Sequence, residues 1–202
     1  MTTLVLSRLD ALVPLVGLPS RGRTLAFIDI ETTGLNPLLS DIVEIAAMKV
    51  DETTLSVLDM VETRVRPPAG TFLDPEALAL NGFNLDDWLD APSADQVLPA
   101  LRTFLDGSRL AGHNPGFDWA FLRTAYFRFG LAAPEVDCHL LDTASLAWPL
   151  LRRGLVPSLS LRELCAHFGI SNHGAHNALR DVVRTYQLFL RLIGETPKAV
   201  LQ

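Results

Sequence analysis

The pattern of apolar and polar positions along the chain predicts strands first and helices later. Residues 25–30 are apolar on both faces apart from one acid, which is typical of a strand that is covered on both faces. The segments 41–50 and 55–67 are two further strand candidates, and the polar turn between them predicts a hairpin continuing from the first strand. Two consecutive prolines, Pro67 and Pro68, then end the sheet region.

The rest of the chain alternates helical patterns with short strand patterns. We expect helices at about 74–80, 93–105, after Pro115, at 159–168 and at 176–193, short strands at 109–113 and 138–143, and one short helix near 4–13. Strands that are followed by alternating helices and strands indicate an α/β domain with a mixed central sheet flanked by helices.

Length and composition fit one ordinary globular domain. The chain has 202 residues, of which 49% are apolar and 20% are charged, so it can bury a core without a metal or disulfide to hold it together. We expect an N-terminal extension over 1–23, the domain over 24–194 and a short C-terminal tail over 195–202.

The cysteines and the N-terminus favour a cytoplasmic protein. Cys138 and Cys165 have no spacing that suggests a zinc site or a secreted disulfide framework. The first 23 residues lack a basic leader, and no segment approaches the roughly 18 apolar residues that a membrane-spanning helix needs. We therefore expect no membrane partner.

The net charge of −6 argues against a protein that coats duplex nucleic acid, because such binding requires neutralisation of phosphates. Local positive patches remain compatible with this charge. The basic residues are nearly all arginine, which suits phosphate oxygens but equally reflects a compositional bias of the genome.

Two acids interrupt the first strand. Asp29 and Glu31 are two residues apart, so on a strand both side chains point to the same face. The turn signal that follows them places both at the carboxyl end of the strand, where open α/β sheets hold ligands. A solvent-facing edge strand is the alternative, but two carboxylates in partly buried surroundings either share a proton or hold a cation.

Two more acids stand near predicted helix starts. Asp118 follows Pro115 in a first helical turn, where a negative charge is favourable even without a function. Asp181 lies near the start of the last helix. His176 precedes Asp181 by five residues and cannot share a helix face with it, so we place it on the loop or first turn before the helix. A capping or surface histidine is the alternative.

Three stretches together resemble a known family. The motifs DIETTGL, HNPGFD and HNALRD are similar, in this order, to those of the DEDDh 3′-to-5′ exonucleases, the DnaQ-like branch of the ribonuclease H-like superfamily. The resemblance spans roughly residues 24–193. Among the members of this family, the chain resembles the exonuclease domain of the proofreading epsilon subunit and ribonuclease T. Val182, where alanine is common, and Pro115 are small departures outside the ligand positions. The resemblance implies a ribonuclease H-like fold.

The same resemblance implies a metal-dependent nuclease. Asp29, Glu31, Asp118 and Asp181 would bind two divalent cations, and His176 would be the general base. All of these ligands are oxygen atoms, which favours Mg²⁺ or Mn²⁺ over zinc. The family's reaction is attack of water on the terminal phosphodiester and release of a nucleoside 5′-monophosphate. His173 is the one rival base, whereas His113, His139 and His167 are read as structural.

The resemblance also implies residues that contact the substrate. Thr32, Leu35 and Phe83 would hold and wedge the last bases, although core packing is the alternative for the last two. Asn114 and Phe117 would shape the wall behind Asp118.

The substrate would be a single-stranded or frayed 3′ end. DNA is preferred, with RNA 3′-end trimming and a catalytically idle nucleic-acid-binding relative as alternatives. The short segment after the last helix favours a stand-alone enzyme, while a polymerase partner or a homodimer stays open.

Overall fold

A five-stranded mixed sheet forms the centre of the protein. The computed structural model describes residues 24–173 and 177–195. The strands are β1 (Thr24–Thr32), β2 (Ile42–Asp51), β3 (Val57–Arg64), β4 (Arg109–Gly112) and β5 (Leu141–Asp142). They lie in the order β3-β2-β1-β4-β5; β3, β2 and β1 are antiparallel, whereas β4 runs parallel to β1 and β5 parallel to β4. The predicted α/β domain with a mixed sheet is confirmed.

Helices occupy most of the chain after the hairpin. They are α1 (Pro75–Asn81), the 3₁₀ helix η2 (Asp86–Trp88), α2 (Ala94–Leu105), α3 (Pro115–Arg128), α4 (Thr143–Arg152), α5 (Leu161–His167) and α6 (Ala178–Leu192). Local sequence explains several of their starts. Ser93 and Gln96 form a capping box at α2, and Ser160 caps α5 by accepting a hydrogen bond from the Glu163 N–H.

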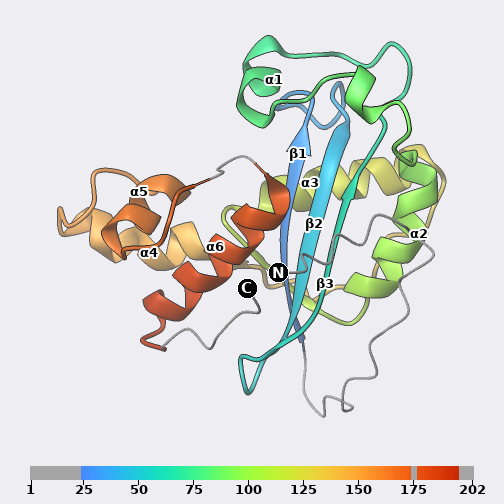
Figure 1. The fold of residues 1–202 in the computed structure, drawn as a ribbon. Helices are drawn as coiled ribbons and strands as arrows, with labels where there is room; N and C mark the ends of the chain where they lie inside the picture. The colour runs from blue at the N-terminus through green and yellow to red at the C-terminus, as the bar shows by residue number, and fades with distance from the viewer. Residues whose placement is uncertain (1–23, 174–176, 196–202) are drawn as a thin grey trace, which may run out of the picture.

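Strand β1 is covered on both faces, as its apolar sequence predicts. On one face the Phe27 ring contacts Tyr186 and Phe189 of α6, with 5.4 Å between ring centroids in each pair. On the other face Ile28 packs in a cluster with residues of α2 and α3. Figure 1 shows this arrangement, with α6 on one side of the strands and α2 and α3 on the other. The site-bearing end of β1 is thus held between two helical layers.

The structure differs from the predicted elements at α4, at the start of α6 and at η2, which the sequence pattern did not predict. Residues 143–152 form helix α4, which the sequence pattern did not predict, because Pro149 lies inside it and Trp148 is exposed. The last helix begins at Ala178 with Asn177 as its N-cap, two residues later than the expected start at 176. The expected helix at 4–13 lies outside the described residues.

Candidate metal centre

Three carboxylates meet at the end of β1. Asp29 and Glu31 lie on the same face of the strand, and Asp181 reaches them from the first turn of α6. One oxygen atom from each of the three lies within 4.8 Å of those of the other two. The expectation that Asp29 and Glu31 face one volume therefore agrees with their positions, and α6 brings in Asp181 from a distant part of the chain.

A fourth carboxylate, Asp118, supports the same end of β1 from α3. Its side chain is buried, and its Oδ1 accepts a hydrogen bond of 3.0 Å from the Ile30 N–H. Glycine at position 112 permits this close packing of α3, because a Cβ there would lie 3.1 Å from the Ile28 carbonyl oxygen and 3.0 Å from Pro115 Cβ. Asp118 is thus tied to the backbone between Asp29 and Glu31.

The crowding of these acids raises their pKa values. Burial, followed by the charges of Asp118, Asp181, Glu31 and Glu44, raises the pKa of Asp29 well above its usual range. Burial and the charge of Glu44 are the largest causes that raise the pKa of Glu31 to about 8. Burial also raises the pKa of Asp118 to about 7, against the hydrogen bond from Ile30. The cluster is therefore short of positive charge.

These shifts predict how stability depends on pH without metal. The folded protein binds protons on Glu31 and Asp118 up to pKa values of about 8 and 7, whereas the unfolded chain loses them near pH 4. The free energy of unfolding should therefore fall as the pH rises from 5 to 8.5. We expect the Tm in chelator to drop by about 4 °C or more over this range.

Thermal unfolding followed by circular dichroism measures this effect. Added Mn²⁺ should recover most of the lost Tm at pH 8.5, because a ligand that binds only the folded state stabilises it. The Asp29→Asn variant in chelator is the control and should show a shallower dependence on pH. A Tm that stays level or rises with pH in chelator would contradict the shifted pKa values.

Two charged residues of the site, Arg184 and Glu44, lie outside the three sequence motifs. Arg184, one turn after Asp181 on α6, is buried and forms an ion pair with that aspartate. Glu44 is directly opposite Glu31 in the β1–β2 register and is also buried. An acid inside the apolar run at 42–48 is the one hint that the sequence offers for Glu44.

The residues expected to contact substrate lie in different environments. Thr32 is buried, and its hydroxyl donates to the Gly34 carbonyl oxygen at 2.7 Å. Leu35 is 77% exposed on the loop that follows β1. Phe83 is only 8% exposed and packs on Trp88, with 5.1 Å between ring centroids, so most of its surface is committed to the core.

Asn81, the last residue of α1, links that helix to the end of β1. Its side-chain amide donates to the Thr32 carbonyl oxygen at 2.9 Å, and a hydrogen bond from the same side chain lowers the pKa of Glu31 against the larger effect of burial. The three sequence motifs do not include Asn81. Its contacts place a neutral donor beside the carboxylate cluster.

The second motif places its residues at the start of α3. Asn114 is exposed, has a left-handed backbone with φ of 66°, and is the N-cap residue of the helix. Phe117 is half-buried and packs on Phe121 at 4.9 Å between ring centroids. Both lie within four residues of Asp118 in the sequence, and their contact with substrate stays a prediction.

Of the two candidate bases, the structure describes His173 but not His176. His176 lies outside the described residues. His173 is exposed, and its carbonyl oxygen accepts a hydrogen bond of 3.4 Å from Arg180 Nη1. His113 has both ring nitrogens within 2.8 Å of partners, the Thr143 hydroxyl and the Leu159 carbonyl oxygen. The contacts of His113 agree with a structural role.

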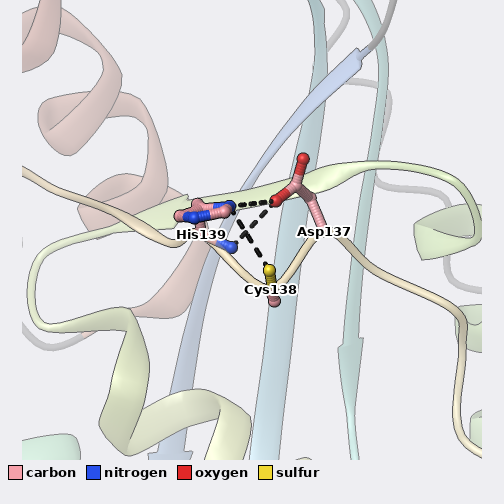
Figure 2. Close-up of side chains that lie close together, drawn as sticks. All are labelled: Asp137, Cys138 and His139. Carbon is pink, nitrogen blue, oxygen red and sulfur yellow. Dashed lines mark hydrogen bonds and ion pairs between the residues drawn. The ribbon is translucent and has the colours of Figure 1, made fainter.

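A second group of metal-ligating side chains lies near the opposite end of β1. Figure 2 shows Asp137, Cys138 and His139, whose donor atoms also lie within 4.8 Å of one another. Asp137 pairs with Arg109, which is opposite Leu25 at the start of β1, at 3.1 Å. Asp137 also accepts the His139 backbone N–H at 2.8 Å. Because arginine already neutralises this carboxylate, the group stabilises a turn.

The donor set at the end of β1 fits hard divalent cations. All the described donors are carboxylate oxygens, which Mg²⁺ and Mn²⁺ prefer. The raised pKa values of Asp29 and Glu31 indicate a negative field that a cation would relieve. Arg184 supplies one positive charge beside Asp181, so the cluster is only partly neutralised by the chain itself.

The chain is similar to known proteins over most of its length. Residues 26–189 match the model of the RNase_T family, which is described as exonuclease. A DNA polymerase III PolC-type from Thermotoga petrophila is 30% identical over 171 residues, which are 84% of this chain and 12% of the polymerase. A putative bifunctional exonuclease/endonuclease protein from Mycobacterium tuberculosis is 34% identical over 179 residues, covering 86% of this chain and 27% of that protein.

Solved structures share the fold. Exonuclease I of E. coli in complex with a dT13 oligonucleotide has a TM-score of 0.73 at 21% identity, over 84% of this chain and 41% of that one. The nuclease domain of 3′hExo, a DEDDh family member bound to rAMP, has a TM-score of 0.70 at 20% identity, over 87% and 94% of the two chains. The expected ribonuclease H-like fold is confirmed. Among residues 24–173 and 177–195, no helix is both long and apolar enough to cross a membrane.

Proposed function

Because the chain belongs to the RNase_T family of exonucleases, we propose that it is a metal-dependent 3′-to-5′ exonuclease that releases nucleoside 5′-monophosphates. The observation that carries this proposal is the convergence of Asp29, Glu31 and Asp181 within 4.8 Å beside the buried Asp118. These four residues come from three distant segments of the chain, β1, α3 and α6, so their meeting is a product of the fold.

The chain's own residues supply binding and proton transfer. Asp29, Glu31, Asp118 and Asp181 would hold two divalent cations, Mg²⁺ or Mn²⁺. When bound, such cations polarise a phosphodiester and lower the pKa of a coordinated water. His176 would accept the proton of the attacking water, since an imidazole with a pKa near 6.5 is largely neutral at pH 7 to 8.

The substrate is proposed to be a single-stranded or frayed 3′ end. Leu35 and Phe72, which are 77% and 54% exposed, provide apolar surface after β1 and before α1 that bases can contact without sequence preference. Exonuclease I, which shares the fold, has been solved with dT13, and this supports a DNA strand as the first substrate to test. RNA is the alternative that the rAMP complex of 3′hExo favours.

The direction of hydrolysis predicts a product pattern. With 5′-labelled single-stranded DNA and Mg²⁺ or Mn²⁺, we expect a ladder that shortens from the 3′ end, and with 3′-labelled DNA we expect labelled mononucleotide at once. A 3′-phosphate should block digestion, because the site is expected to accept a terminal hydroxyl. Excess chelator should stop the reaction.

Matched RNA oligonucleotides identify the sugar preference in the same assay. Nicking of a circular single strand as the main activity would refute the exonuclease proposal. Tight binding of the oligonucleotides with no hydrolysis in either metal would instead identify a catalytically idle relative.

A further inference from the structure

The buried Glu44 carboxylate holds the start of helix α6. Glu44 Oε1 accepts 2.7 Å from Asn177 Nδ2 and 3.2 Å from the Ala178 backbone N–H. The two partners are 133 and 134 residues away along the chain, so these bonds join β2 to α6. Neither the three motifs nor the carboxylate cluster assigns a role to Glu44.

Asn177 has a double function at this junction. Its side-chain Oδ1 accepts the Arg180 N–H at 3.2 Å and so caps α6, while its Nδ2 group donates to Glu44 and, at 3.3 Å, to Glu62 Oε1 on β3. The capping bond fixes where the helix begins. The bonds to the two glutamates fix where that beginning lies on the sheet.

The location of this junction connects it to the proposed chemistry. Asn177 directly follows His176, and Asp181 lies four residues further along the same helix. Glu44 is paired with Glu31 across the β1–β2 ladder. One carboxylate therefore bonds to the residue next to the proposed base, on the strand that neighbours two of the proposed metal ligands.

We propose that Glu44 and Asn177 are positioning residues that set the first turn of α6, and with it Asp181, against Asp29 and Glu31. This inference rests on the proposed exonuclease function. Two hydrogen bonds, from the Asn177 side chain and from the Ala178 backbone N–H, meet at one Glu44 oxygen and fix the direction in which α6 leaves the sheet. Loss of the junction should leave the sheet intact but misplace the first turn of α6.

The first pair of variants separates hydrogen bonding from charge. Glu44→Ala removes both bonds and should lower kcat and the affinity for Mn²⁺ by about 10- to 100-fold each, with little change in KM, as for other groups that orient metal ligands. Glu44→Gln keeps an oxygen acceptor and loses only the charge, so it should retain far more activity. Asp59→Asn, a change on β3 outside this junction, is the control.

A second variant tests the same contact while keeping a cap for α6, in case Glu44→Ala does not fold. Asn177→Ser keeps a side-chain oxygen that can cap α6 but is too short to keep the amide bonds to Glu44 and Glu62. It should lower kcat as Glu44→Ala does, and the double variant should be little worse than either single one, because both act through the same contact.

The measurements are single-turnover hydrolysis of single-stranded DNA, Mn²⁺ titration by calorimetry without DNA, and thermal unfolding. Glu44→Ala with wild-type kcat and wild-type Mn²⁺ affinity, in a protein whose wild type is active, overturns the inference alone. Glu44→Gln as impaired as Glu44→Ala also overturns it, because charge and not position would then explain the effect. A wild type that hydrolyses nothing overturns the proposed function instead.

Discussion

Asp29→Ala and Asp181→Ala should each reduce metal-dependent hydrolysis to less than about a thousandth of the wild-type rate, a loss of roughly 4 kcal/mol of transition-state stabilisation. Each substitution removes one of three carboxylates whose oxygen atoms lie within 4.8 Å of one another. The remaining groups cannot reproduce the donor set, because Asp118 is directed to the Ile30 N–H.

Folding should survive the Asp29 substitution. Burial and, after it, the charges of four neighbouring acids raise the pKa of Asp29, so removal of its carboxyl relieves an unfavourable charge in the metal-free protein. We expect the Tm of Asp29→Ala in chelator to equal or exceed that of the wild type at pH 8. Single-turnover hydrolysis with Mg²⁺ and thermal unfolding measure the two effects, with the exposed Asp90→Ala as control. Hydrolysis by the wild type that persists in excess chelator would refute the requirement for metal.

His176→Ala should lower the single-turnover rate by about 10² to 10⁴-fold, the usual span for loss of a general base. In the sequence, His176 directly precedes Asn177, the N-cap of α6, and lies five residues before Asp181. Affinity for Mn²⁺ should change little, because histidine is not among the expected ligands.

His173→Ala is the matched comparison for the base. His173 is exposed and its carbonyl oxygen is bonded to Arg180, so its side chain should contribute much less. Hydrolysis by both variants at saturating Mg²⁺ from pH 6 to 9 distinguishes them. If His173→Ala proves the more damaging, the base is assigned to the wrong histidine while the exonuclease proposal survives.

The sequence predicted β1 and its two acids because they depend on local pattern. A run that is apolar on both faces requires cover on both sides, and acids two residues apart share a face whatever the rest of the fold does. The pattern failed for α4, where the exposed Trp148 and the internal Pro149 obscure the helical period. It also placed the start of α6 two residues early, before the cap at Asn177.

Glu44 shows why part of the site could not be predicted from the sequence. A single acid in an apolar strand has no partner at a fixed spacing, and its partner Asn177 lies 133 residues away. Only the packing of α6 on β2 brings the two together. The ion pair between Asp181 and Arg184 could not be predicted for another reason. An acid and an arginine three residues apart are common on exposed helix faces, so the spacing does not indicate a buried pair.

Arg184 gives the carboxylate cluster a cation that cannot be dialysed away. Bound metal ions leave when a chelator is added, but the guanidinium stays beside Asp181 because both belong to the first two turns of α6. Burial keeps this charge from the screening that salt imposes on exposed pairs. A preparation stripped of metal thus begins from a cluster that its own chain already neutralises in part.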